Sequence, residues 1–111
     1  MADYIEWEDF AKVEIRVGTI IEAEHFKEAR KPALKVKVDF GDIGIKKSSA
    51  QITDLYEPED LLGRQVIAVV NFRSKQIANF MSECLILGVL GSEGVILLQP
   101  DRPVSNGLKI G

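Results

Sequence analysis

Apolar and polar residues alternate most regularly between positions 34 and 41, LKVKVDFG. The even positions from Leu34 to Phe40 are apolar, and the odd positions between them are charged. Because successive side chains of a strand point to opposite faces, this alternation predicts a strand with one buried face. GDIG then predicts a turn, and residues 43–51, IGIKKSSAQ, predict the second strand of a hairpin.

The N-terminal part of the chain predicts a helix, a strand and a turn. Apolar residues at helical spacing predict a short amphipathic helix over residues 7–15, WEDFAKVEI. An alternating pattern predicts a strand over residues 13–23, in which Gly18 is typical of a bulge or a bend in a barrel. Residues 25–33, HFKEARKPA, predict a polar turn that Pro32 closes.

The C-terminal half predicts mainly strands. A helical turn is expected at residues 58–63, PEDLLG, with proline at its start and glycine at its end. Three strands are predicted over residues 65–72, 82–90 and 94–100, followed by a loop over 100–107. Together these elements predict an all-β fold, a closed five-stranded OB-type (oligonucleotide/oligosaccharide-binding) barrel with short helices. We expect residues 1–111 to form one domain.

The strands predicted over residues 65–72 and 82–90 are apolar on both faces. A small barrel has a single interior, so the outer apolar face needs a cover. An apolar edge left exposed would promote aggregation. Either the terminal segments or a second copy of the chain could cover it, and we interpret the pattern as a homodimer.

Composition and charge narrow the function. The chain is 46% hydrophobic and 28% charged, as an ordered globular protein is, and its net charge is −3. That sign opposes strong electrostatic attraction to nucleic acids as a whole, so an RNA site would need a local basic patch. The start of the chain has no secretory signal pattern, and no apolar run is long enough to span a bilayer. We expect a cytoplasmic protein without membrane insertion.

The residues that carry catalytic or metal chemistry are sparse. The single histidine, His25, and the single cysteine, Cys84, cannot supply a structural zinc set. Cys84 lies in an apolar run and is expected to be a buried, inert thiol. Ser48 and Ser49 have no adjacent base that would activate a serine nucleophile. We predict no catalytic residues, no metal site and no cofactor, and so not an enzyme.

The segment from Asn71 to Glu83, NFRSKQIANFMSE, is the candidate for ligand binding. Its basic residues suit phosphates and its aromatic residues suit stacked bases, but the same mixture suits an apolar groove for an extended peptide. A loop folded back onto the core is the third alternative. The predicted peptide contacts are Phe72, Ile77, Phe80 and Met81, with Arg73 and Lys75 at the rim.

The order of these segments resembles the tRNA-binding domain family. The similar segments begin with FAKVEIRVGTIIEAEHF and LKVKVDFG, continue with YEPEDLLGRQVIAVVNF and MSECLILG, and end with VILLQPDRPVSNGLKIG. Within the family, FGDIGIKKSSAQITDLY and VVNFRSKQIANFMSECLILG are most similar to its secretion-related chaperones. The resemblance implies an OB-type barrel, a homodimer and binding without catalysis. It also implies two kinds of partner, which are tRNA and unfolded or presecretory polypeptides linked to the protein export machinery.

Departures from the family pattern decide which partner we expect first. Asn71 and Ser82 match the pattern that carries RNA contacts, and Lys75 lies close to its basic position. However, Ala78-Asn79-Phe80 and Glu83-Cys84-Leu85 replace glycine-containing and basic positions, which favours a different surface. A chaperone-like polypeptide-binding protein is thus the first hypothesis, and a tRNA-binding protein is the alternative. The residues predicted to contact RNA are Lys46, Lys47, Asn71, Arg73, Lys75 and Ser82.

Overall fold

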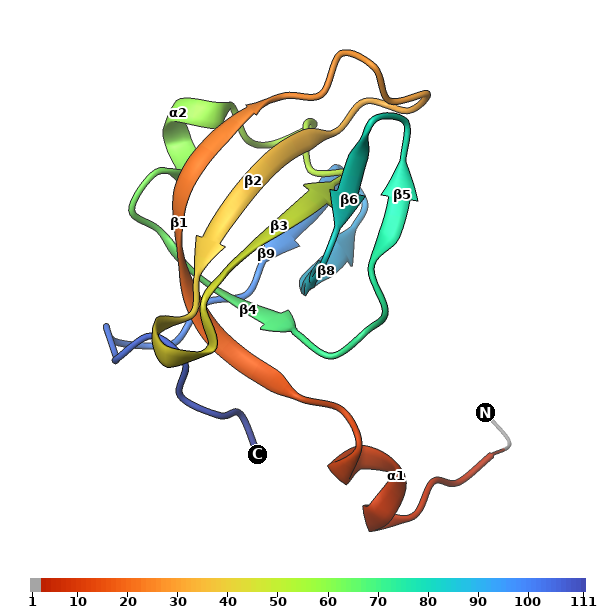
Figure 1. Ribbon diagram of the computed structural model, residues 1–111, viewed down its shortest axis with the longest axis vertical. Coiled ribbons are helices and arrows are strands. Elements are labelled where there is room, and N and C mark those ends of the chain that lie inside the picture. The colour runs from red at the N-terminus through yellow and green to blue at the C-terminus, as the bar shows by residue number, and fades with distance from the viewer. Residues whose placement is uncertain (1–2) are drawn as a thin grey trace.

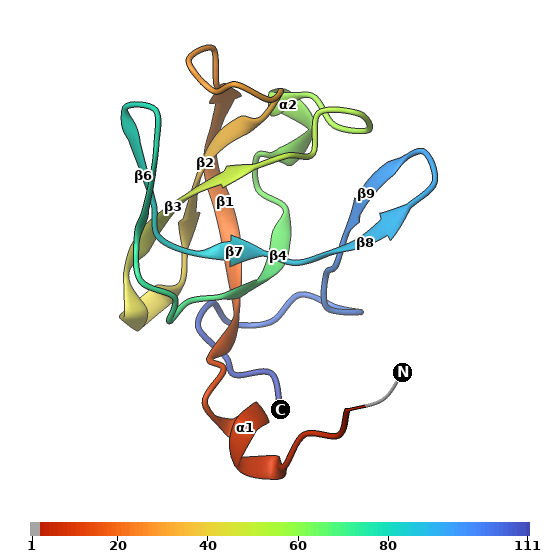
Figure 2. The ribbon, with the colours of Figure 1, turned by 90° about the vertical axis from the view of Figure 1, so that its right-hand side faces the viewer.

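A five-stranded antiparallel sheet forms the body of the protein in the computed structural model, which describes residues 3–111. The first two residues of the predicted domain lie outside the described residues. The strand order is β3-β2-β1-β4-β7, and the sheet curls into a nearly closed barrel (Figures 1 and 2). Its strands are β1 (Ile15–His25), β2 (Leu34–Asp39), β3 (Ile45–Ala50), β4 (Gln65–Val69) and β7 (Leu85–Ile86). The predicted fold class is confirmed.

Two small hairpins and three short helical segments complete the architecture. The hairpins are β5 (Lys75–Ile77) with β6 (Phe80–Ser82), and β8 (Gly88–Gly91) with β9 (Gly94–Leu97). The helical segments are α1 (Trp7–Ala11), the 3-10 turn η1 (Gly41–Ile43) and α2 (Pro58–Leu61). α2 starts at the predicted proline, and Gly63 just after it has a φ of +81°, which favours glycine.

The core follows from the alternation that predicted β2. Its even-numbered residues from Leu34 to Phe40 are each at most 1% exposed and pack in one cluster with Ile20 and Val66. The odd-numbered charged residues lie on the outer face, where Lys35 and Lys37 pair across the sheet with β1. One face of β2 therefore supplies the barrel interior, as predicted.

Gly18 is not the site of the bulge in β1. The bulge in β1 lies at Ile21, where the register with β2 shifts between Ile20 and Glu22. Gly18 instead lies where a Cβ atom would be 2.5 Å from Val38 Cγ1 and 2.7 Å from the Phe40 ring. The missing side chain lets the core close over β1, so glycine serves packing here.

The N-terminal helix is shorter than predicted. α1 ends at Ala11 instead of residue 15, and the chain is tied to the barrel just after it. The Asn71 side chain accepts a hydrogen bond from the Glu14 N–H at 2.9 Å and donates one to the Lys12 carbonyl at 2.7 Å. α1 thus projects from the barrel (Figures 1 and 2), and Trp7 on it is 88% exposed.

The strand predicted over residues 82–90 is interrupted. β7 covers only Leu85–Ile86 and pairs with β4. β8 then begins at Gly88 and pairs with β9 in a separate sheet. A Cβ atom on Gly88 would lie 2.5 Å from Val95 Cγ1, so this glycine allows the two hairpin strands to approach. The sequence predicts a single strand here because both pieces carry the same residue types.

Candidate functional site

A groove lies between the loop of residues 26–33 and the β5–β6 hairpin. The loop connects β1 to β2, and the groove has a volume of about 690 Å³. Ser49 and Gln51, at the end of β3, lie between the two walls. The walls contribute Glu28, Ala29, Arg30, Lys31 and Ala33 from the loop, and Lys75, Gln76, Ile77 and Ala78 from the hairpin.

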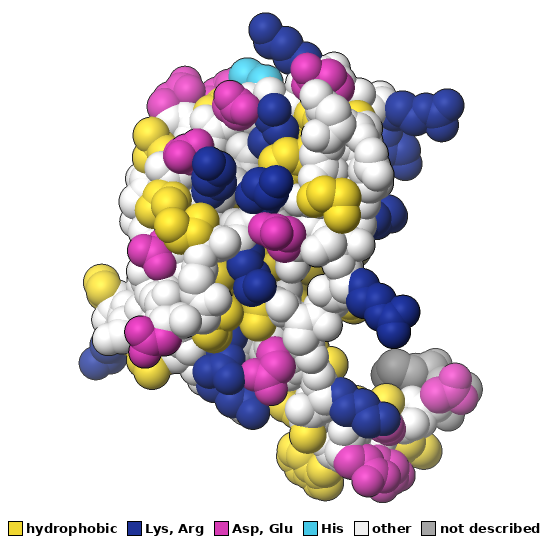
Figure 3. Space-filling model, viewed as in Figure 1, with side chains coloured by type: hydrophobic (Ala, Val, Ile, Leu, Met, Phe, Trp, Pro, Cys, Tyr) yellow, Lys and Arg dark blue, Asp and Glu magenta, His cyan; other side chains and the backbone are white. Residues whose placement is uncertain are grey.

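The loop of residues 26–33 is anchored at its two ends, so its charged middle projects outward. Phe26 and Ala33 are both 4% exposed, and the Phe26 N–H donates to the Ala33 carbonyl at 3.0 Å. Lys27, Arg30 and Lys31 between them are exposed. In Figure 3, basic side chains extend beyond the body where this loop and the hairpin lie in Figure 1. The residues were predicted as a polar turn, and their three cations in eight positions were the missed signal.

The β5–β6 hairpin has one face toward the barrel and one face away from it. Ile77 pairs with Phe80 and Lys75 pairs with Ser82, so these four side chains share the face toward the barrel. Met81 lies on the opposite face and is 40% exposed. The predicted peptide contacts Phe80 and Met81 therefore point in opposite directions.

Side chains of the hairpin close the barrel against β3. The Ser82 Oγ accepts a hydrogen bond from the Ser49 N–H at 3.1 Å. The Glu83 carboxylate accepts one from the Lys47 N–H at 2.9 Å, while the Glu83 N–H donates to the Lys47 carbonyl at 2.7 Å. Ser82 and Glu83 thus bond to the backbone of β3 where a neighbouring strand would otherwise bond. The Ser82 hydroxyl therefore has a structural role.

Phe80 links the two walls of the groove. Its ring meets the Phe26 ring edge-on at a centroid distance of 5.4 Å. The Lys47 ammonium lies 5.2 Å from the Phe80 centroid, and the Lys35 ammonium lies 5.8 Å from it and 5.4 Å from the Phe26 ring. These cation–π contacts fix two lysines beside the aromatic pair. Because Phe80 is on the hairpin and Phe26 begins the loop, the contact sets the spacing of the walls.

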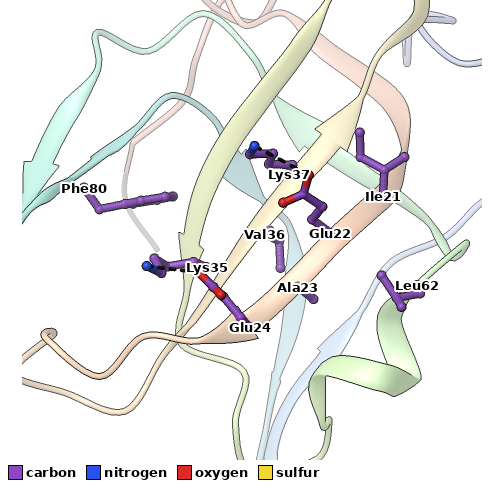
Figure 4. Close-up of a pocket in the computed structure, with 9 residues that line it drawn as sticks. All are labelled: Ile21, Glu22, Ala23, Glu24, Lys35, Val36, Lys37, Leu62 and Phe80. Carbon is purple, nitrogen blue, oxygen red and sulfur yellow. Dashed lines mark ion pairs between the residues drawn. The ribbon is translucent and has the colours of Figure 1, made fainter.

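The outer face of β1 and β2 beside Phe80 carries paired charges. Figure 4 shows Lys35 bound to Glu24 and Lys37 bound to Glu22, at 3.1 Å and 3.5 Å, with Phe80 pointing toward Lys35. The pocket on this face measures about 310 Å³. Its cations are largely neutralised by the neighbouring carboxylates.

The cations of the groove differ from Lys35 and Lys37 in having no nearby carboxylate. Within residues 3–111, no carboxylate lies within 4.0 Å of Arg30, Lys31 or Lys75. Glu28 is the acidic residue of the groove lining. The local charge is therefore positive although the whole chain carries −3. This is the basic patch that an RNA site would need.

The other predicted RNA contacts are scattered. Lys46 pairs with Val38 and Lys47 pairs with Lys37, so the two lysines lie on opposite faces of β3. Asn71 uses its amide to hold the residues after α1. Arg73 follows it, before the start of β5, and is not part of the groove lining, which begins on this wall at Lys75. Of the predicted RNA residues, the groove lining includes Lys75.

The other two predicted apolar peptide contacts are Phe72 and Ile77. Phe72 follows Asn71 before β5 begins and is 59% exposed, whereas Ile77 lines the groove. The structure therefore does not gather the predicted peptide contacts into one surface.

Cys84 and Ser48 are both buried, and a hydrogen bond joins them. The Ser48 Oγ donates to the Cys84 carbonyl at 2.9 Å, and Ser48 is 1% exposed. Burial raises the pKa of the Cys84 thiol to about 11. A protonated thiol is a poor nucleophile. Within residues 3–111, no three His, Cys, Asp or Glu side chains are grouped to hold a metal ion.

The curled sheet and the groove beside it define a small OB-type binding barrel. A family model described as a tRNA binding domain matches residues 15–109, and the chain belongs to this family. Among residues 3–111, no helix is long and apolar enough to cross a membrane.

Two solved structures of the chaperone CsaA are similar over the whole chain. The protein from Picrophilus torridus is 54% identical with a TM-score of 0.93, covering 97% of this chain and all 100% of that one. The protein from Bacillus anthracis str. Ames is 51% identical with a TM-score of 0.92, covering 98% and 100%. The resemblance predicted from the sequence is confirmed.

A curated relative shares the domain within a larger protein. The methionine–tRNA ligase of Methanococcoides burtonii is 36% identical over 95% of this chain. The matched part is 15% of that ligase, so this chain spans a small fraction of its length.

Proposed function

We propose that this protein is a non-catalytic, cytoplasmic RNA-binding protein that holds tRNA in the groove between loop 26–33 and the β5–β6 hairpin. The observation that carries the proposal is the set of cations without nearby carboxylates on both walls, Arg30 and Lys31 on one and Lys75 on the other. Such cations bind phosphates and release counterions, which supplies sequence-independent affinity. Membership of the tRNA-binding domain family supports the same ligand.

The remaining polar residues suit the role of positioning. Ser49 and Gln51 contribute a hydroxyl and an amide to the lining of the groove. Groups of this kind bond to phosphate and sugar oxygens and set the register of the nucleic acid. The groove contains few large apolar side chains, so it suits an RNA backbone better than an apolar peptide. This ranking reverses the order of the two hypotheses drawn from the sequence.

Salt dependence of tRNA binding tests the proposal. We expect the affinity of labelled tRNA, measured by fluorescence anisotropy, to fall steeply between about 50 and 200 mM salt. In the double variant Arg30→Gln/Lys31→Gln, the slope of log affinity against log salt should decrease by about two, one for each lost phosphate contact. Arg102→Gln removes one positive charge from an exposed position in the C-terminal segment, away from the groove, and should leave the slope unaltered. Binding that is independent of salt, or equal in the two variants, would contradict the proposal.

A second function is favoured by a specific observation, the 51–54% identity to the solved structures of the chaperone CsaA. We propose that the protein also binds unfolded or presecretory polypeptide, in connection with protein export. Its apolar surface supports this, since Phe72 and Leu90 are 59% and 87% exposed. Titrating one sample with tRNA and with a denatured protein, at two salt concentrations, separates the functions. Binding of the denatured protein through apolar contacts should persist at the higher salt concentration, where tRNA binding weakens. If the higher salt concentration abolishes the binding of both ligands, a separate polypeptide function is contradicted.

We further propose that the protein is a homodimer joined through its N-terminal segment. Apolar side chains gather around α1 (Figure 3), where Tyr4, Ile5 and Trp7 are 96%, 70% and 88% exposed. A segment with so much exposed apolar area is an interaction surface in a soluble protein. A second copy of this chain would cover it.

A further inference from the structure

The outer face of β1 and β2 lies directly beside the basic groove. Lys35 on β2 pairs with Ser49 on β3, and Ser49 lines the groove. Phe80 lines the pocket on this outer face, and the Lys35 ammonium lies 5.8 Å from the centroid of its ring. Phe80 belongs to the β5–β6 hairpin, which forms one wall of the groove. An RNA strand that leaves the groove along β3 therefore meets this face next.

Three lysines form a row on the outer face of β2 and β3. Lys35 and Lys37 are two positions apart on β2, so their side chains share a face and lie about 6.8 Å apart along the strand. Lys47 is the partner of Lys37 on β3 and points to the same face. Its ammonium lies 5.2 Å from the Phe80 ring, at the edge of the groove. Such a row of cations would extend the phosphate-binding surface of the groove.

Two carboxylates on β1 neutralise most of this row. Glu24 is the register partner of Lys35, and Glu22 is the register partner of Lys37. The carboxylate-to-ammonium distances are 3.1 Å and 3.5 Å (Figure 4). The side chains of Glu24 and Glu22 are 70% and 64% exposed, so an approaching phosphate meets their negative charge at the surface. Within residues 3–111, Lys47 has no carboxylate within 4.0 Å, so the charge changes where this face meets the groove.

The fold does not depend on these two ion pairs. The backbones of β1 and β2 are paired from Thr19 to His25, and their inward side chains fill the core. Ion pairs between exposed side chains add little to such a ladder, because water screens both charges. The main physical effect of the two carboxylates is therefore on the charged ligands that can approach this face.

We propose that Glu22 and Glu24 confine bound RNA to the groove. They hold Lys35 and Lys37 in ion pairs and repel phosphates from the outer face of β1 and β2. This inference rests on the proposed binding of tRNA in the groove, and it names the residues that end the bound segment. The two carboxylates set the length of RNA that the protein covers without contacting the RNA themselves.

Neutralising the two carboxylates tests the inference, with labelled tRNA and fluorescence anisotropy. Glu22→Gln/Glu24→Gln should raise the affinity by about tenfold or more at about 100 mM salt and steepen the slope of log affinity against log salt by about two. Glu59→Gln/Glu93→Gln is the control, because it removes the same charge from exposed positions in α2 and in the turn between β8 and β9. The control should raise the affinity less than about threefold and leave the slope unaltered.

Lys37→Gln shows whether the gain comes from the released lysines. In the unaltered chain this substitution should change the tRNA affinity less than about twofold, because the paired Lys37 binds no phosphate. In the Glu22→Gln/Glu24→Gln background it should reduce the salt slope by about one, since one new phosphate contact is lost. Equal effects of Lys37→Gln in the two backgrounds overturn the inference.

The length of the bound strand is the direct measurement of the RNA segment covered. The affinity of oligouridylates of increasing length should reach its plateau about two nucleotides later for Glu22→Gln/Glu24→Gln than for the unaltered chain, one for each released lysine. If the plateau length stays the same, or if the variant gains no more affinity than its control, the inference is overturned while tRNA binding in the groove stands. If the unaltered chain and the variant both fail to bind tRNA, the inference and the proposed function are overturned together.

Discussion

At the scale of single residues, glycine and cysteine show how tightly the barrel is filled. Gly18 and Cys84 are both in the apolar interior, although neither takes part in the groove. Gly18 tests how much space the core has for an added methyl group, and Cys84 tests how burial changes the ionisation of a thiol.

Gly18→Ala should destabilise the protein by about 1–3 kcal/mol, because the added methyl group overlaps Val38 and Phe40 in a core that has no free space. The measurement is the urea unfolding midpoint at constant slope. Gly111→Ala is the matched control, since nothing lies within 4 Å of a Cβ atom there. Equal midpoints for the two variants would show that the core adjusts at no cost.

Cys84 gives the protein a stability change at high pH. Burial raises the pKa of its thiol from 9.0 to about 11, so the unfolded chain ionises first. The resulting stabilisation is fully present below about pH 9 and is lost as the pH rises to about 11, a change of about 2–3 kcal/mol. Urea unfolding at a series of pH values should show this decline in the unaltered chain relative to Cys84→Ala. Parallel curves for the two proteins would contradict it.

At the scale of elements, the β5–β6 hairpin is the least predictable part of the site. Its strands are three residues each, and its turn contains Ala78, which has a φ of +51°. Within residues 3–111, Ala78 is the sole non-glycine residue with positive φ. The hairpin holds this conformation because Ser82 and Glu83 fix it to β3 and Phe80 fixes it to Phe26.

Ala78→Gly should therefore stabilise the protein, by about 0.5–1 kcal/mol, since glycine adopts positive φ without the clash of a Cβ atom. A thermal unfolding experiment should give a midpoint a few degrees higher. Ala29→Gly, in the opposite wall of the groove and at ordinary φ, is the control and should lower the midpoint. A lower midpoint for Ala78→Gly would mean that the turn is not strained.

At the scale of the whole molecule, α1 is joined to the barrel by a few hydrogen bonds and leaves its apolar side chains exposed. A barrel of 111 residues has a small core, and burial against another subunit adds stability. The exposed N-terminal segment is the place where the proposed homodimer can be tested without disturbing the barrel.

Trp7→Ser should weaken the dimer by about 2 kcal/mol, or roughly thirtyfold in Kd, because buried tryptophan dominates many interfaces. Sedimentation velocity over a range of protein concentrations measures the effect. Leu62→Ser, 56% exposed and next to α2, removes a comparable apolar side chain from another surface and should leave the Kd unchanged. A monomer at all concentrations for the unaltered chain would refute the homodimer.

The sequence by itself determined strands β1 to β4 of the barrel and the buried face of β2, because the apolar and polar pattern of a strand is a local property of the chain. It also determined the inert character of Cys84, since an apolar run around a lone thiol predicts burial. The hairpin within residues 71–83 escaped detection because three-residue strands carry too little periodicity.

Only the tertiary structure decided where the site lies. Curling of the sheet brings loop 26–33 beside the β5–β6 hairpin, which starts more than forty positions later in the chain. Pairing of β2 with β3 puts Lys46 and Lys47 on opposite faces, although they are adjacent in sequence. Closure of the barrel uses Ser82 and Glu83 in place of a strand. These features depend on contacts between segments that are distant in the sequence, and a local pattern of residues does not specify which distant segments meet.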